Sequence, residues 1–250
     1  MAEDIYRWQR EVYDLVHGAT QDHDREVTKL LKRVRGAVGN NPNSWLDCAC
    51  GTGLHLAALQ RAGISVLAGM DNSPSQLEVA GENLSGIPLH LADLRNFEVV
   101  TPPGGFDVVS CLLSSVGHLH SDEDYLAALR SMAAHLHSKG VVVVEPWIAL
   151  EDFRPGRLDI DEVKLDGGRI LQITKHSLSG TEACPLAKLE FRFLMSGEEQ
   201  AVVRDWTMEM ELRLRSLEEQ LALFGKVFSS VDFQSTGAGS RGVFLARKPR

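Results

Sequence analysis

The sequence predicts an α/β protein built on a doubly wound, mostly parallel seven-stranded sheet. Strand-like runs and helical patterns alternate five times between residues 44 and 147, as in a parallel sheet with helical crossovers. A small-residue turn follows the first strand, and a β-rich stretch breaks the alternation after residue 147. At 250 residues the chain is long enough for one well-buried domain with an insertion, or for two small domains at most.

An N-terminal helical cap is expected over residues 1–40. Apolar residues recur at helical spacing over 4–16 and again over 24–36. The Asn-Asn-Pro-Asn run at 40–43 is loop chemistry and marks the entry to the first strand.

The core sheet is expected over residues 41–150, where apolar runs alternate with amphipathic stretches. Its predicted strands begin at Trp45 and then cover 64–70, 88–91, 106–111 and 141–144. Its predicted helices cover 54–62, 74–84 and 122–137. The nearly all-apolar run at 106–111 is typical of a parallel strand covered on both faces.

An antiparallel β insertion is expected over residues 151–215, before the sheet is completed by residues 216–250. Its β-rich runs are 170–174, 189–194 and 202–214. A helix at 218–228 and a hairpin formed by 231–234 and 243–246 are expected to end the core sheet.

The composition of the chain argues against several classes of partner. A net charge of −8 argues against nucleic acid, which usually binds a basic surface. No apolar run is long enough to cross a membrane and no signal-peptide pattern begins the chain, so a cytoplasmic protein is expected. The cysteines lack the spacing of a zinc site or a disulfide framework and are interpreted as small apolar filler in a reducing compartment. They are Cys48, Cys50, Cys111 and Cys184.

The turn after the first strand carries Gly51 and Gly53, which permit positive φ and close approach of a ligand to the helix N-terminus that follows. A dinucleotide fingerprint requires a third glycine where Leu56 stands, which disfavours a nicotinamide-dependent dehydrogenase. With Asp47 four residues before Gly51, the stretch resembles motif I of class I S-adenosylmethionine-dependent methyltransferases, which have a Rossmann-like fold.

Two further acidic residues follow successive strands. Asp71 is placed to accept hydrogen bonds from ribose hydroxyls, or to cap the helix at 74–84, or both. In the methyltransferase fold, Asp93 would take the adenine amino group, and a neighbouring backbone N–H would meet a ring nitrogen. The predicted cofactor-binding residues are Asp47, Ala49, Gly51, Gly53, Asp71, Asn72, Asp93 and Leu94.

The candidate general base is His118, in the loop after the fourth strand. An amine must lose a proton before its lone pair attacks a methyl group, and the ordinary pKa of histidine suits that task near neutrality. The alternative is an ordinary loop histidine. This loop lacks both the Asp/Asn-Pro-Pro-aromatic motif of base-modifying enzymes and the metal-binding carboxylates of catechol-type enzymes. A small organic acceptor and no metal are therefore expected.

The chain resembles the TDP-aminosugar N-methyltransferases of macrolide antibiotic biosynthesis over nearly its whole length. The matching segments are 12–17, 47–53, 114–119, 141–147 and 240–242. The resemblance implies that Tyr13 and His118 are catalytic and lie beside the acceptor nitrogen. It implies these substrate-binding residues: Tyr13, His17, Ser115, Glu145, Trp147, Ser240 and Arg241.

Arg241 would contact the nucleotide diphosphate, although it could equally be a surface cation. Two departures fall near the acceptor pocket: residues 18–23 lack the family's lysine and tyrosine, and Ile148 replaces a second tryptophan. A different small amine, glycine-like or other, and a hydroxyl or carboxylate acceptor therefore stay open as alternatives. A non-catalytic cofactor-binding protein is the alternative outside the enzymes. The insertion is expected to cover the site, to form a homodimer contact, or to do both.

Overall fold

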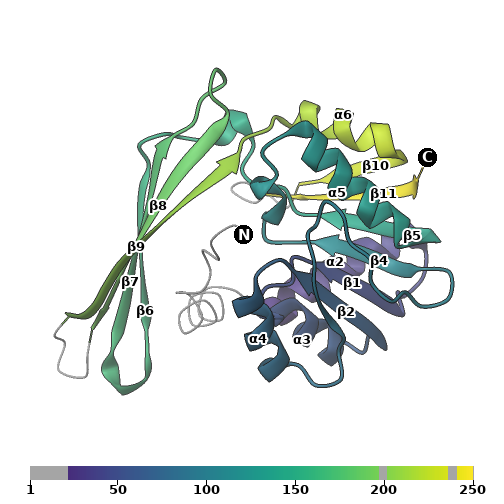
Figure 1. Ribbon diagram of the computed structural model, residues 1–250, viewed down its shortest axis with the longest axis horizontal. Coiled ribbons are helices and arrows are strands. Elements are labelled where there is room, and N and C mark those ends of the chain that lie inside the picture. The colour runs from purple at the N-terminus through teal and green to yellow at the C-terminus, as the bar shows by residue number, and fades with distance from the viewer. Residues whose placement is uncertain (1–21, 197–201, 236–240, 250) are drawn as a thin grey trace.

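The computed structural model describes residues 22–196, 202–235 and 241–249. Its elements form a seven-stranded sheet flanked by helices and a separate four-stranded antiparallel sheet that extends away from it (Figure 1). The predicted fold class is thereby confirmed, including the insertion before the last strands. The helix predicted over 4–16 lies outside the described residues.

The large sheet has the order β10-β11-β5-β4-β1-β2-β3. Its first five strands in the chain pair in parallel, whereas β11 runs antiparallel to both β5 and β10. The strands are β1 (Ser44–Cys48), β2 (Val66–Asp71), β3 (Leu89–Leu91), β4 (Phe106–Cys111), β5 (Leu136–Val144), β10 (Phe228–Gln234) and β11 (Val243–Pro249). The carboxyl ends of β1, β2 and β4 therefore meet along one edge, where a doubly wound sheet binds ligands.

Helices cover both faces of this sheet and bury its alternating side chains. Apolar residues of α2, α3 and α4 pack with one face of the strands, and those of α5 and α6 pack with the other. The helices are α2 (His23–Val38), α3 (Leu54–Arg61), α4 (Pro74–Asn83), α5 (Asp122–Ala134) and α6 (Leu217–Val227). Because β1 alternates between the faces, Trp45 packs on the α2–α3 side and Leu46 on the α5–α6 side.

The insertion is a meander of long strands: β6 (Leu158–Lys164), β7 (Ile170–Ser179), β8 (Leu186–Ser196) and β9 (Val202–Arg213). Its aromatic residues include Phe193 and Trp206, whose rings stack 5.1 Å apart on paired strands. Where β9 returns to the core, buried Arg215 donates from Nε to Asp122 Oδ1 (3.2 Å) and lies over the Tyr125 ring at 4.7 Å. These contacts attach the insertion to α5.

Several predicted boundaries are wrong by a few residues. The helix predicted over 122–137 ends at Ala134, because Leu136 already pairs with Phe106 and starts β5. The strand β6 was absent from the predicted runs because Asp159, Asp161 and Glu162 interrupt its apolar pattern. Of the cysteines, Cys184 is exposed, which contradicts the filler interpretation there, whereas the other three are buried free thiols. No helix among the described residues has the length and apolarity to span a membrane.

Candidate cofactor and substrate site

The turn between β1 and α3 is held by a carboxylate from the neighbouring strand. Asp71, at the end of β2, accepts the Gly51 N–H on Oδ2 (2.8 Å) and the Ser73 N–H on Oδ1 (2.9 Å). Ser73, and not Asp71, caps α4, since its hydroxyl accepts the Gln76 N–H at 3.3 Å. The Asp71 carboxylate thereby links the turn before α3 to the turn before α4.

Gly53 ends the turn with φ +83°, in the left-handed region. A Cβ added there would lie 2.5 Å from Leu84 Cδ1, so the turn packs closely on the end of α4. Ala49 also has positive φ, at 59°, without being glycine. Such a conformation is strained, and strained backbone is concentrated at functional sites.

Asp47 is buried beneath this turn, with 2% of its surface exposed. It takes part in a hydrogen-bonded relay inside the sheet: the Trp45 Nε1–H donates to Ser110 Oγ (2.7 Å), and the Ser110 hydroxyl donates to Asp47 Oδ1 (2.6 Å). Burial raises the pKa of Asp47 to about 6, against the opposing influence of His55 and the Ser110 hydrogen bond. The structure thus keeps a poorly solvated negative charge under the turn.

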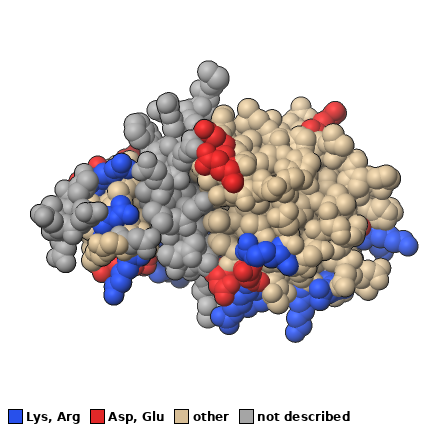
Figure 2. Space-filling model, turned by 90° about the horizontal axis from the view of Figure 1, so that it is seen from below, with Lys and Arg blue, Asp and Glu red and all other residues tan. Residues whose placement is uncertain are grey.

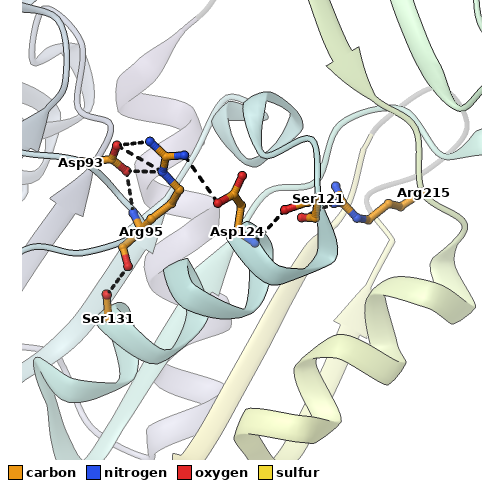
Figure 3. Close-up of polar contacts among 6 residues, drawn as sticks. All are labelled: Asp93, Arg95, Ser121, Asp124, Ser131 and Arg215. Carbon is orange, nitrogen blue, oxygen red and sulfur yellow. Dashed lines mark hydrogen bonds and ion pairs between the residues drawn. The ribbon is translucent and has the colours of Figure 1, made fainter. Parts of the chain in front are cut away.

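Asp93, the third predicted acidic ligand, is engaged by Arg95 (Figure 3). Both carboxylate oxygens accept from the guanidinium, at 2.6 Å from Nη2 and 2.9 Å from Nε, and Oδ1 also accepts the Arg95 N–H. The Arg95 side chain holds the pKa of Asp93 below its ordinary value. Arg95 reaches on to Asp124 Oδ1 at 3.4 Å, and its carbonyl accepts the Ser131 hydroxyl, so the Asp93 loop is attached to α5.

The remaining predicted cofactor contacts lie beside these acidic residues. Asn72 is exposed next to Asp71, and Leu94 is buried next to Asp93. The turn, Asp47 and Asp71 lie along the carboxyl edge of β1 and β2, as predicted, with Asp93 just after β3.

The loop after β4 is strained and strongly fixed. Leu113 and Ser114 both have positive φ, at 49° and 65°. The Leu113 N–H donates to Glu145 Oε2 (3.0 Å), and the Ser114 hydroxyl donates to the Pro146 carbonyl (2.9 Å). Arg241, from the hairpin between β10 and β11, donates to Ser114 Oγ at 2.8 Å and lies 3.9 Å from Glu145 Oε1. Glu145 and Arg241 thus hold the loop in place.

His118 ends the short helix η2 (Ser115–His118) in this loop. Its side chain reaches the surface, yet the surrounding protein removes much of its contact with water. This desolvation, together with the charge of the neighbouring His120, lowers the pKa of His118 to about 4. His118 is therefore neutral near pH 7. Its neighbour His120 is 3.1 Å from the Glu211 carbonyl of β9, which connects the loop to the insertion.

The insertion packs directly on η2. A Cβ added to Gly117 would lie 3.3 Å from Leu212 Cδ2 and 3.4 Å from Trp147 Cβ. Trp147 is 9% exposed and packs against Phe153 with ring centroids 5.7 Å apart. Its ring therefore mainly fills the junction between core and insertion, and its predicted sugar contact stays a prediction.

Of the other predicted substrate residues, Ser115 is half-buried and its hydroxyl donates to the Leu112 carbonyl (3.1 Å). Tyr13, His17 and Ser240 lie outside the described residues. Sequence reasoning missed Ser110, although a serine in the otherwise apolar run 106–111 was a usable signal. It also missed Arg95, whose spacing of two from Asp93 gave no indication of the bidentate pair.

Comparison with known proteins places this site in a family. A family model described as "Methyltransferase domain" matches residues 46–140. A dTDP-3-amino-3,6-dideoxy-alpha-D-glucopyranose N,N-dimethyltransferase from Streptomyces fradiae is 32% identical over 237 residues, covering 94% of this chain and 88% of that protein. The chain belongs to the TDP-aminosugar N,N-dimethyltransferase family. It is therefore a methyltransferase that uses S-adenosylmethionine.

Other members of the family are similarly close. A dTDP-3-amino-3,4,6-trideoxy-alpha-D-glucopyranose N,N-dimethyltransferase from Streptomyces venezuelae is 32% identical over 236 residues, covering 94% of this chain and 95% of that one. The crystal structure of Streptomyces venezuelae DesVI superposes with a TM-score of 0.85 at 31% identity, covering 95% and 97% of the two chains. CalS10, a SAM-bound amino pentose methyltransferase from Micromonospora echinaspora involved in calicheamicin biosynthesis, gives 0.83 at 27% identity, also covering 95% and 97%.

The residues present fit S-adenosylmethionine. Gly53, which has no Cβ to clash with Leu84, keeps the turn packed on the end of α4 at the N-terminus of α3, where backbone N–H groups suit a ligand. The Asp71 carboxylate lies beside this turn and is of the type that accepts hydroxyl donors, and the buried Asp47 charge suits a cation. The Asp93 oxygens are occupied by Arg95, so Asp93 can accept the adenine amino group only by sharing it with that guanidinium.

Proposed function

We propose that this enzyme transfers two methyl groups in succession to the amino group of a TDP-linked amino sugar, in the biosynthesis of a glycosylated natural product. The proposal is supported by the activities of its relatives in Streptomyces fradiae and Streptomyces venezuelae, each an N,N-dimethyltransferase of a dTDP-amino sugar. The observation that carries it is the rigid loop after β4, which presents His118 and is bound by Arg241.

The core residues would hold the cofactor. Asp71, beside the turn, would bind the ribose hydroxyls, and Asp47 would stabilise the cationic amino-acid end from beneath the turn. Gly53 would keep the turn packed on α4, so that the cofactor can approach the α3 N-terminus. When bound, S-adenosylmethionine supplies an electrophilic methyl group on a sulfonium.

His118 would accept the proton that the substrate ammonium must lose. Its lowered pKa keeps the imidazole unprotonated at neutral pH, but makes it a weak base. The substrate ammonium must therefore be held where proton loss is favourable, and positioning then provides much of the acceleration. Tyr13 and His17, as the resemblance implies, would complete the acceptor side.

Arg241 would meet the nucleotide diphosphate. Its side chain is 38% exposed while one nitrogen donates to Ser114, so the remaining guanidinium N–H groups can reach a ligand. Glu145 at 3.9 Å offsets part of its charge. Ser240 would contribute beside it.

A nucleic-acid substrate is not part of the proposal. The net charge of −8 disfavours a phosphate backbone as partner, and the face shown in Figure 2 carries both blue and red side chains among its coloured residues.

The test is mass spectrometry of reactions containing S-adenosylmethionine and a mixed acceptor panel. The panel holds TDP-3-amino and TDP-4-amino sugars, glycine, sarcosine and simple biogenic amines. Two methyl increments confined to an amino sugar would support the proposal. Modification of a non-sugar amine alone would refute the proposed amino-sugar substrate and the proposed role of Arg241. If the acceptor were a hydroxyl, NMR of the product would identify a methylated oxygen.

A matched variant tests the base. His118→Asn should reduce turnover by roughly 10²-fold or more, since general base catalysis typically contributes that much. Unchanged turnover at saturating substrate would remove His118 from the role. The His137→Asn control changes a half-buried histidine at the start of β5, away from the loop, and should keep full turnover.

A further inference from the structure

Two helices on one face of the sheet bring three metal-ligating side chains together. His23 and Glu26 lie three residues apart on one side of α2, and His55 lies in the first turn of α3. Glu26 Oε2 is 3.3 Å from His23 Nδ1 and 3.5 Å from His55 Nε2, and the ligand atoms of all three residues lie within 4.8 Å of one another. The two imidazole rings meet edge to face with centroids 4.8 Å apart.

Polar atoms in this cluster lack the hydrogen bonds that burial demands. His23 is 8% exposed, and among the described residues neither of its buried ring nitrogens has a hydrogen-bond partner of acceptable geometry. Glu26 Oε2 is likewise buried without one, even though it is the atom nearest to both rings. His55 is also 8% exposed. Buried polar groups in proteins are normally satisfied, so the unpaired atoms of His23 and Glu26, with His55 beside them, mark a cluster suited to a ligand.

The donor set determines the chemistry of that ligand. Two imidazole nitrogens and one carboxylate oxygen suit a divalent transition metal such as zinc, whereas calcium and magnesium prefer oxygen ligands alone. The 3.3 and 3.5 Å separations match the distance of about 3.4 Å between neighbouring ligands of a tetrahedral zinc site. Glu26 is 41% exposed, so a water can approach from its side as the fourth ligand.

The helices are already held in register for such a site. Arg61, at the end of α3, donates from Nε and Nη2 to Asp24 Oδ1 in the first turn of α2, at 3.0 and 2.8 Å. Leu30 and Leu59 pack in the same core cluster beneath the two helices. The ligand atoms are therefore carried on rigid, packed elements.

We propose that His23, Glu26 and His55 bind one divalent transition-metal ion of the zinc class, which fastens α2 to α3. The ion takes no part in methyl transfer. Because α3 starts directly after the Gly51–Gly53 turn, the ion would couple α2 to the cofactor-binding turn. The site depends on neither the acceptor nor the role of His118.

The competing explanation is an ion pair without metal. The His23 and His55 rings hold the pKa of Glu26 near 2, so a protonated histidine beside the carboxylate would also relieve the cluster. The two explanations differ in stoichiometry, because only a metal site saturates at one ion per chain.

The test is titration of the chelator-treated full-length chain with Co²⁺, followed by its visible d–d absorption, and with Zn²⁺, followed by calorimetry. A Cys184→Ser background removes the exposed thiol as an adventitious ligand. We expect one equivalent of each ion to bind and to raise the melting temperature. His23→Gln and Glu26→Gln should each weaken binding by about 10-fold or more, since loss of even supporting groups has effects of that size. His176→Gln, on β7 of the insertion, is the matched control and should bind as the parent does.

Unsaturable binding, or equal affinity in all three variants, would overturn the proposal. Should a variant fail to fold, as judged by far-UV circular dichroism, ¹⁵N-histidine NMR of the unmutated chain decides the matter. Zn²⁺ should then shift two imidazole signals in slow exchange, and shifts of none or of all of them would refute the site. S-adenosylmethionine affinity with and without Zn²⁺ then measures the coupling to the turn.

Discussion

Ser110→Ala should move the ionisation of Asp47 and, with it, the pH dependence of cofactor binding. The Ser110 hydroxyl donates at 2.6 Å to a carboxylate whose pKa burial already raises to about 6. A hydrogen bond to a charged group contributes about 1.5–3 kcal/mol, and 1.36 kcal/mol corresponds to one pKa unit. Losing this bond should therefore raise the pKa of Asp47 by about one to two units, to between about 7 and 8.

The consequence for binding follows from the charge. Because the pKa of Asp47 in the folded protein lies above its ordinary 3.8, ionisation destabilises the cofactor-free fold by about 3 kcal/mol, an effect that develops as pH rises from 4 to 6. A cationic ligand offsets it. Cofactor affinity of the unmutated enzyme should thus increase as pH rises through 6. In Ser110→Ala at pH 7 the dissociation constant should be raised by about 2- to 10-fold, with recovery near pH 9.

Calorimetric titration with S-adenosylhomocysteine, which keeps the amino-acid end of the cofactor, measures the pH dependence of the dissociation constant between pH 5 and 9. Asp47→Asn should abolish the pH dependence. Trp45→Phe removes the donor to Ser110 but leaves the Asp47 bond, so it should lower stability while keeping the midpoint near its original pH. Ser229→Ala, the control, deletes a hydroxyl that donates to the Lys248 carbonyl, far from the site, and should change neither the dissociation constant nor the midpoint of its pH dependence. An unshifted midpoint in Ser110→Ala would refute the reasoning.

Three further predictions concern the same edge of the sheet. Gly53→Ala should weaken S-adenosylmethionine binding by about 10-fold or more, because the strain of a left-handed alanine adds to the close contact with Leu84. The control Gly63→Ala, at φ +88° but in open space, should lower only the melting temperature. Equal losses of binding in the two variants would contradict this prediction. Asp71→Asn should raise the dissociation constant for S-adenosylmethionine by about 10-fold or more, and Asp93→Asn should raise it by less, since Arg95 already occupies the Asp93 oxygens. The reverse order, measured by calorimetry, would refute the assignment of Asp71 as the stronger cofactor ligand. NMR titration of His118 should show a midpoint well below 6, and a midpoint at or above 6.5 would contradict its desolvation.

Strong periodic patterns and short-range spacing made the core predictable. The apolar run at 106–111 and the glycine turn each fix their element locally, so β4 and the turn to α3 lie where the sequence places them. Asp47, Asp71 and Asp93 follow from the parallel topology, because it brings strand ends to one edge.

Features that depend on partners distant in the sequence could not be predicted. Nothing near Ser110 in the sequence indicates that it joins Trp45 to Asp47 across two strands. Likewise, the pairing of Glu26 with His55 needs the packing of α2 on α3. Strand β6 was not predicted because its apolar residues change face along the strand: Leu158 and Ile160 are exposed, whereas Val163 is buried.

The bond from Arg241 to Ser114 has a consequence for how the enzyme matures during synthesis. The cofactor turn is complete once β1, β2 and α3 have formed, well before β10 and β11 leave the ribosome. The strained loop after β4 obtains Arg241 only when the terminal hairpin has docked beside β5. A nascent chain would therefore form the strands around the cofactor turn before its acceptor loop is fixed, because Arg241 is made 127 residues after Ser114.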